Sequence, residues 1–225
     1  MSVYVVCGID TEIGKTIVTG LIGRYFLNLG RSVFTQKFVQ TGCTGKSADV
    51  LIHREIMGTR WNELDEQGIS CPYNFSFPAS PHLAAGMVGE EIDPSILEKS
   101  TARALEENEI VIIEGAGGLL VPLTKKLTLL DYLAGQDVSM ILVTSPRLGS
   151  INHTLLSLEA LRKRNIKLAG LVYNVYGDHC IEIANDSLTV FKAALTKYGY
   201  EERIVVLDEQ GEEKGEANWQ TLFDR

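Results

Sequence analysis

Short runs of β-branched and aliphatic residues alternate along the chain with segments of helical periodicity. Most of the runs are continuously apolar, which is typical of parallel strands covered on both faces. This order predicts an α/β fold in which one parallel sheet is flanked by helices on both faces. The strands are expected at Val3–Cys7, Val33–Phe38, Ile110–Ile113, Val138–Thr144, Leu168–Asn174 and Ile204–Leu207.

The segments between these runs place apolar residues three and four positions apart, as amphipathic helices do. The first begins after residue 14 and carries such a face from Ile17 to Leu29. Asp93 followed by Pro94 favours a helix start, because the carboxylate caps and proline tolerates the first helical position. Further helices are expected at Ser47–Met57, Pro94–Leu105, Leu129–Ala134, Ser150–Arg164 and Ile181–Tyr198.

The length of 225 residues suits one domain spanning residues 1–225, which can bury a core without disulfides or a structural metal. Neither an internal repeat nor a linker interrupts the pattern. The biased segment 208–216 is acidic and contains glycine, so we expect an exposed loop or tail there.

Composition narrows the classes of function. A formal net charge of −8 disfavours broad electrostatic binding to nucleic acid or to anionic membranes. The four cysteines are scattered without metal-ligand spacing, so free thiols are expected. The chain opens directly on a strand-like run and has no apolar stretch of membrane-spanning length, which predicts a cytoplasmic protein.

The first chemical signal lies between the first strand and the first helix, in the loop Gly8-Ile9-Asp10-Thr11-Glu12-Ile13-Gly14-Lys15-Thr16. A loop that wraps onto a helix N-terminus supplies converging N–H donors and the positive end of the helix dipole, which together suit a phosphate. Lys15 is expected to neutralise the outer phosphates and Thr16 to bind magnesium. The glycines are separated by five residues instead of four, so the loop is a variant. The alternative is an ordinary turn with a chance Lys-Thr pair.

Two charged residues are expected at strand ends. Glu114 follows the run Ile110–Ile113 and opens the stretch Glu114-Gly115-Ala116-Gly117-Gly118, while Lys37 lies at the end of the second strand. Ligands of open α/β sheets gather at the carboxyl ends of the strands, so both side chains are expected to face the crevice near the loop. The alternatives are an acid that caps a tight turn and a solvated surface lysine.

Further motifs extend this set: Val39 with Thr41-Gly42, Pro72-Tyr73, Pro78-x-Ser80-Pro81-His82, Pro122-Leu123 and Leu148-Gly149-Ser150-Ile151-Asn152-His153-Thr154. In order and spacing, from about residue 2 to residue 175, the combination resembles the dethiobiotin synthase family. The resemblance implies a P-loop NTPase-like fold and a homodimer with its substrate site at the subunit interface.

The resemblance also implies an activity, that of an ATP-dependent cyclo-ligase of biotin biosynthesis. In that reaction CO2 converts one amine of 7,8-diaminopelargonic acid to a carbamate, which attacks the γ-phosphate of ATP. The neighbouring amine then closes the ring, giving dethiobiotin, ADP and phosphate. The catalytic residues implied are Thr11, Lys15 and Lys37. The cofactor implied is Mg²⁺, held by Thr16, Asp49 and Glu114.

The same resemblance implies two sets of binding residues. Nucleotide contacts are Glu12, Ile13, Gly14, Lys15, Thr16, Ile17 and Asn174. Substrate contacts are Thr41, Gly117, Gly118, Leu148, Gly149, Ser150 and Asn152. The last four open a helix that, in the family, a second subunit supplies to receive the distal carboxylate of the substrate. Plain helix capping by Ser150 and a turn-forming role for Asn174 explain those two residues without any ligand.

Two other classes use the same fold. Dimeric switch ATPases of the partitioning or cell-division type carry an extra lysine early in the loop, whereas residues 9–13 contain none. A non-catalytic nucleotide-binding module related to dethiobiotin synthase is the second alternative. Loss of Lys37 or Glu114 would favour such a module, and both residues are present.

Overall fold

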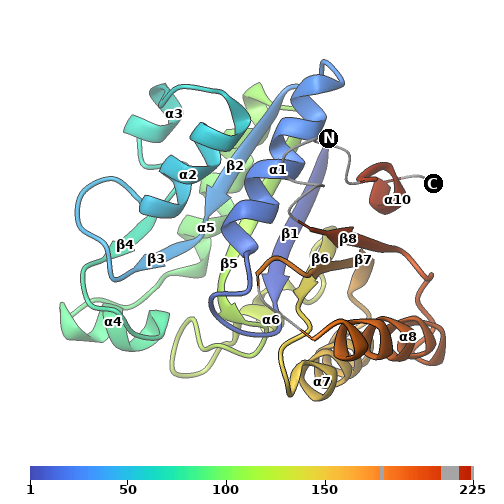
Figure 1. Cartoon of the computed structure of the whole chain (residues 1–225). Helices are drawn as coiled ribbons and strands as arrows, with labels where there is room; N and C mark the ends of the chain where they lie inside the picture. Colours follow the sequence, from blue (N-terminus) through green and yellow to red (C-terminus); the bar gives the residue numbers. More distant parts are fainter. Residues whose placement is uncertain (178–179, 209–217, 224–225) are drawn as a thin grey trace.

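The computed structural model describes residues 1–177, 180–208 and 218–223 (Figure 1). In this part of the chain, six parallel strands form the main sheet in the order β2-β5-β1-β6-β7-β8. The predicted α/β fold with a parallel sheet is therefore confirmed. The strands are β1 (Ser2–Gly8), β2 (Val33–Lys37), β5 (Ile110–Gly118), β6 (Ser139–Thr144), β7 (Lys167–Asn174) and β8 (Ile204–Leu207).

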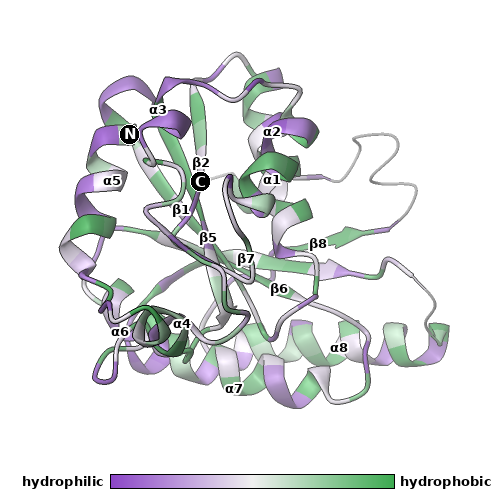
Figure 2. Cartoon of the chain, turned by 90° about the vertical axis from the view of Figure 1, so that its left-hand side faces the viewer, coloured by the Kyte–Doolittle hydropathy of each residue, from purple (hydrophilic) through white to green (hydrophobic). Residues whose placement is uncertain are grey.

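Helices cover both faces of this sheet. Figure 2 shows α1 and α2 on one side of the strands and α5 on the other. The same view shows hydrophobic and hydrophilic bands alternating along α7 and α8, as amphipathic helices require. The helices that the sequence predicted follow their expected ranges to within two residues: α1 (Lys15–Asn28), α2 (Ala48–Met57), α5 (Pro94–Glu107), α6 (Leu129–Leu133), α7 (Ser150–Lys163) and α8 (Ile181–Lys197).

The core lies where the central strands meet the helices. Val5, Val6, Ile112 and Leu142 have no exposed surface, because β1, β5 and β6 are covered on both faces. Burying one such side chain contributes about 1.5–3 kcal/mol. The apolar residues of the central strands thus stabilise the sheet.

Helices α1 and α2 pack unusually close to each other. A Cβ atom on Gly20 of α1 would lie 2.9 Å from Cβ of Ile56, and one on Gly23 would lie 2.7 Å from Sδ of Met57. Both distances are shorter than ordinary van der Waals contact, so a larger residue at Gly20 would displace the base of the Ile56 side chain, and one at Gly23 would displace the flexible end of Met57. The contact fixes the helix that begins with Lys15 against the helix that carries Asp49.

Several short elements were not predicted. A separate two-stranded parallel sheet joins β3 (Val39–Thr41) to β4 (Tyr73–Phe75). Helices α3 (Glu63–Glu66), α4 (Pro81–Met87) and α10 (Gln220–Phe223) were also missed. All of these elements have three to seven residues, too few for a periodic pattern to stand out.

Two expectations about the strands need correction. Phe38 lies between β2 and β3 instead of ending the second strand. Glu114 does not follow the central strand, because β5 continues through it to Gly118. Glycine has low strand propensity, so the glycine-rich half of β5 did not read as a strand. It extends because β1 lies beside it, with Gly8 paired to Gly118.

The four cysteines are free thiols, as expected. No helix in the described part of the chain is long and apolar enough to cross a membrane. The acidic segment 208–216 lies outside the described residues except for Asp208, which is exposed.

Candidate functional site

The loop between β1 and α1 has the geometry of an anion-binding turn. Gly14 precedes α1 with φ 93°, a left-handed conformation that favours glycine, and no side chain caps the first turn. The N–H groups at the start of α1 are therefore available to an external acceptor. Asn174, at the end of β7, donates its amide to the carbonyl of Ile13 at 3.0 Å. This bond fixes the loop from the opposite side of the sheet crevice.

Lys15 lies inside this turn. Its side chain is buried, and Nζ donates to the carbonyl of Asp10 at 2.6 Å. Burial, followed by repulsion from Lys37, lowers the pKa of Lys15. An added anion would offset both effects, so the loop is electrostatically suited to a phosphate.

Two side chains that lie far from Glu114 in sequence contact its carboxylate, and a third is linked to it through Lys37. The hydroxyl of Thr16 donates to Oε1 at 3.0 Å, and Nζ of Lys37 donates to the same oxygen at 2.6 Å. Nζ of Lys37 also lies 2.6 Å from Oδ2 of Asp49. The parallel register places Lys37 directly beside Glu114 on neighbouring strands. The structure thus brings together Lys15, Thr16, Lys37, Asp49 and Glu114, as the sequence predicted for the crevice.

The charges in this cluster are buried and mutually compensated. Burial alone would raise the pKa of Glu114, but the charge of Lys37 and the hydrogen bond from His53 lower it to about 2. Burial would lower the pKa of Lys37, but Glu114 and Asp49 outweigh it and raise this pKa. Glu114 is thus an anion and Lys37 a cation at neutral pH. The backbone N–H of Phe38 also donates to the carbonyl of Glu114 at 3.3 Å, which ties the residue after Lys37 to β5.

The oxygen atoms of this cluster fit a magnesium ion. Mg²⁺ prefers one or two carboxylates, waters and phosphate oxygens, and two carboxylates and a hydroxyl converge here beside the phosphate-binding turn. Among the described residues, this cluster included, no group of three or more His, Cys, Asp or Glu side chains is able to hold a metal by itself. A closed zinc-type site therefore has no support among them.

His53 belongs to this cluster although sequence reasoning did not select it. Its side chain has no exposed surface, and Nε2 lies 2.8 Å from Oε2 of Glu114. One signal was available in the sequence: His53 follows Asp49 by four residues, so both point from the same face of α2.

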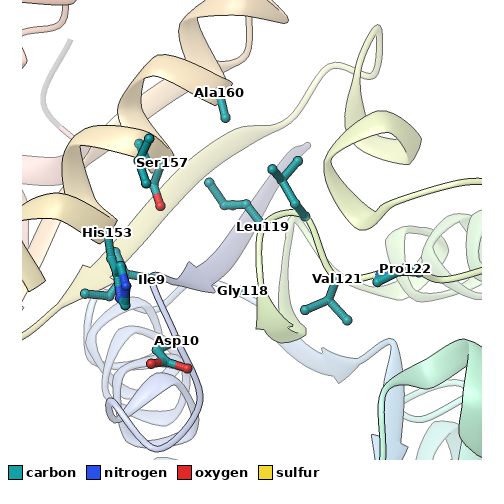
Figure 3. Close-up of a pocket in the computed structure, with 11 residues that line it drawn as sticks. Ile9, Asp10, Gly118, Leu119, Val121, Pro122, His153, Ser157 and Ala160 are labelled. Carbon is teal, nitrogen blue, oxygen red and sulfur yellow. The ribbon is translucent and has the colours of Figure 1, made fainter. Parts of the chain in front are cut away.

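A cleft of about 440 Å³ opens on the other side of the loop, between the end of β5 and α7. Figure 3 shows His153, Ser157 and Ala160 of α7 on one wall and Leu119 and Val121 on the other. Asp10 of the loop and Gly118 of β5 also line it. The walls are mainly apolar and one end is the phosphate-binding turn, which suits a ligand with an aliphatic chain.

The remaining predicted catalytic and substrate residues lie on several different elements and loops. Thr11 and Leu148 are exposed, and Leu148 shows 89% of its surface. Thr41 ends β3, and Gly117 and Gly118 end β5.

The turn before α7 is tied to the phosphate loop. Ser150 is buried, with its hydroxyl 3.3 Å from that of Ser145, whereas Asn152 is exposed. Gly149 has φ 94° and precedes α7 without a side-chain cap. The neighbouring Arg147 forms an ion pair with Asp10, a link that the motifs did not indicate. The alternative explanation of Ser150 as the cap of α7 is therefore wrong, because Gly149 holds the cap position.

Comparison with known proteins identifies the family. A family model described as an AAA domain matches residues 2–205. The ATP-dependent dethiobiotin synthetase BioD of Chlorobaculum tepidum is 48% identical over 204 residues, which cover 91% of this chain and 85% of that protein. The chain belongs to the ATP-dependent dethiobiotin synthetase family. The BioD 2 protein of Haemophilus influenzae is 49% identical over 177 residues, covering 79% of this chain and 93% of that protein. The family predicted from the sequence is thus confirmed.

Solved structures with the same fold are less similar to this chain in sequence than these relatives are. The MinC:MinD cell division protein complex of Aquifex aeolicus gives a TM-score of 0.56 at 15% identity, over 96% of this chain and 87% of that one. HypB of Helicobacter pylori, solved in complex with nickel, gives 0.56 at 15% identity over 100% of this chain and 83% of that one. These similarities establish the P-loop fold that the sequence predicted.

Proposed function

We propose that this chain closes the ureido ring of dethiobiotin from 7,8-diaminopelargonic acid, CO2 and ATP. The observation that carries the proposal is the buried cluster in which Lys15 and Lys37 flank the carboxylate of Glu114 beside the phosphate-binding turn. Transfer of a phosphoryl group to a carbamate brings two anions together, and such a step needs cations between them. Family membership indicates the substrates, and the cluster provides the positive charges that this step needs.

The reaction proceeds in three balanced steps. One amine of the substrate attacks CO2 and loses a proton, which gives a carbamate. A carbamate oxygen attacks the γ-phosphorus of ATP, the bond to the β-γ bridging oxygen breaks, and ADP leaves. The second amine attacks the resulting carbonyl carbon, loses a proton and expels phosphate, so the ring closes with one carbon from CO2.

Each residue of the cluster has a role in this scheme. Lys15 and the N–H groups that follow Gly14 bind the phosphates, and Lys37 neutralises the carbamate as it approaches them. Thr11 and Thr41 hold the carbamate end. Glu12, Ile13, Ile17 and Asn174 complete the nucleotide site, with Asn174 toward the base.

Magnesium would be held by Thr16, Asp49 and Glu114, and it supplies positive charge that stabilises the transferring phosphates. Both carboxylates contact Nζ of Lys37 at 2.6 Å, so Lys37 and a cation compete for the same oxygens. A bound cation would neutralise these two carboxylates, and Nζ of Lys37 would then be free to turn toward the carbamate.

The substrate chain extends from Gly117 and Gly118 along the apolar cleft. Its distal carboxylate meets the N-terminus of α7 from a second subunit, at Leu148, Gly149, Ser150 and Asn152. Leu148 supports this arrangement, because an aliphatic side chain 89% exposed suits an interface between two copies of the chain. We accordingly propose a cytoplasmic homodimer that binds neither nucleic acid nor membranes.

The test is a reaction with the purified chain, ATP, Mg²⁺ and bicarbonate, with and without 7,8-diaminopelargonic acid. We expect ADP release that depends on the diamine and equals the dethiobiotin formed, measured by mass spectrometry. Glu114→Gln should abolish both products, because one magnesium-binding carboxylate is lost. ADP release at the same rate with and without the diamine would refute the proposal and favour a switch ATPase.

A further inference from the structure

His53 contacts one of the two carboxylate oxygens of Glu114, and Thr16 and Lys37 contact the other. Oε1 of Glu114 receives the hydroxyl of Thr16 at 3.0 Å and Nζ of Lys37 at 2.6 Å. Oε2 faces the opposite way and lies 2.8 Å from Nε2 of His53. One oxygen therefore points toward the proposed cation site, and the other contacts a residue that the proposed reaction does not use.

The polar contacts of His53 point to one task. Because Glu114 is ionised and only accepts hydrogen bonds, Nε2 of His53 must be the donor. The other ring nitrogen, Nδ1, is buried without a hydrogen-bond partner among the described residues. Burying an unpaired polar atom is unfavourable, and an aliphatic residue would avoid that penalty. The bond to Glu114 is thus the contact that accounts for a histidine at this position.

The helix gives this bond a particular geometry. Asp49 and His53 are four residues apart on α2, so they lie on the same face one turn from each other. One turn of α2 thus supplies a carboxylate of the proposed cation site and the donor that holds the other carboxylate. The terminal torsion of a glutamate is broad and roughly two-fold, so without a donor on Oε2 the carboxylate can rotate.

We propose that His53 is a positioning residue: its Nε2–H group holds Oε2 of Glu114 and thereby keeps Oε1 directed at Thr16 and the divalent cation. Hydrogen bonds behind metal-binding groups orient them, and their loss typically weakens metal affinity about 10- to 100-fold. The inference rests on the cation site of the proposed function.

The experiment measures Mn²⁺ binding by electron paramagnetic resonance, with ADP present and no turnover. We expect His53→Leu to weaken Mn²⁺ binding about 10- to 100-fold while leaving ADP affinity without metal unchanged. His53→Gln should keep affinity within about threefold, because its amide nitrogen can replace Nε2 as the donor. His53→Asn should behave like His53→Leu because its amide is too short, and it serves if the leucine variant fails to fold.

The control is Ile56→Ala, which loosens the packing of α2 against Gly20 without touching Glu114. We expect this variant to lose stability in urea and to keep its Mn²⁺ affinity. Unchanged Mn²⁺ binding in His53→Leu would overturn the inference, as would an equal loss in the glutamine variant or in Ile56→Ala.

The Glu114→Gln variant separates the two levels of the proposal. Parent-like Mn²⁺ affinity in this variant would refute the cation site itself. Weak binding in Glu114→Gln together with normal binding in His53→Leu would leave the cation site standing and refute only the role of His53.

Discussion

Replacement of Lys37 by methionine tests the central feature of the site, an ammonium group shared by two carboxylates. Methionine keeps much of the aliphatic length and removes the charge. The contacts of Lys37 are within the sheet crevice, beyond the phosphate-binding turn, so nucleotide affinity should stay within a few-fold of the parent. Turnover should fall about 10³-fold, the effect typical of losing a cation that stabilises a phosphoryl-transfer transition state.

The structure also sets the expected loss of stability. The pKa of Glu114 is lowered from 4.5 to about 2, with the charge of Lys37 as the largest of the causes that lower it, so Lys37 stabilises the buried carboxylate. Glu114 is 1% exposed, so solvent does not compensate for the missing charge. We therefore expect Lys37→Met to lose about 3 kcal/mol of unfolding free energy at neutral pH.

The pH dependence follows from the direction of the shift. Because the folded-state pKa of Glu114 is depressed, its contribution in the parent is complete above about pH 4.5 and is lost as pH falls toward about 2. In Lys37→Met burial loses its largest opposing effect, so this pKa rises above its value in the parent, and protonation of Glu114 relieves the variant as pH falls from neutrality. The stability gap between parent and variant should narrow under mildly acidic conditions.

Urea unfolding followed by circular dichroism, at neutral and mildly acidic pH, measures this gap. The double variant Lys37→Met/Glu114→Gln is the matched control, because it removes the unpaired buried charge. It should recover most of the stability and none of the turnover. Full turnover in Lys37→Met, or a stability equal to the parent at neutral pH, would contradict our reasoning about the cluster.

Three further variants test separate parts of the site. Lys15→Ala should weaken both nucleotide affinity, measured by calorimetry, and turnover; unchanged affinity would show that the loop does not hold phosphates. Gly14→Ala should destabilise the chain by about 1–3 kcal/mol in urea, because φ is 93° and a Cβ would lie 2.4 Å from Nδ2 of Asn174. Asp65→Asn should lower the free energy of unfolding by about 3 kcal/mol at neutral pH, because the buried Arg54 guanidinium loses the charged partner that lies 2.7 Å away. The kcat of the folded variant should change little, and a parent-like denaturation midpoint would argue against this ion pair.

The main sheet was predictable because its strands are buried on both faces. Continuous apolar runs such as Ile110–Ile113 occur where helices cover both sides, and they stand out in the sequence. The glycines that extend β5 carry no such signal, since their extended conformation comes from pairing with β1. The three-residue strands β3 and β4 likewise depend on each other and not on a local pattern.

In the site, as in the sheet, features that depend on local sequence were predictable, and features that depend on long-range contacts were not. The phosphate-binding turn was predictable because its donors, its lysine and its threonine lie within nine consecutive residues. The bonds of Lys37 to both Asp49 and Glu114 depend on the sheet register and on the placement of α2, which sequence spacing does not give. His53 was missed for this reason, since its partner lies 61 residues away in the chain.

The close contact between α1 and α2 has a consequence for protein engineering. Replacing helical glycines by alanine is a common route to a more heat-resistant enzyme, worth about 0.4–1 kcal/mol where space allows. At Gly20 the added methyl group would lie 2.9 Å from Cβ of Ile56, next to the backbone of α2, so the same change would strain the contact between the two helices. At Gly23 it would meet the flexible side chain of Met57, which is easier to displace. Attempts to make this chain more thermostable should therefore leave Gly20 untouched, and Gly23 is the safer of the two positions for alanine.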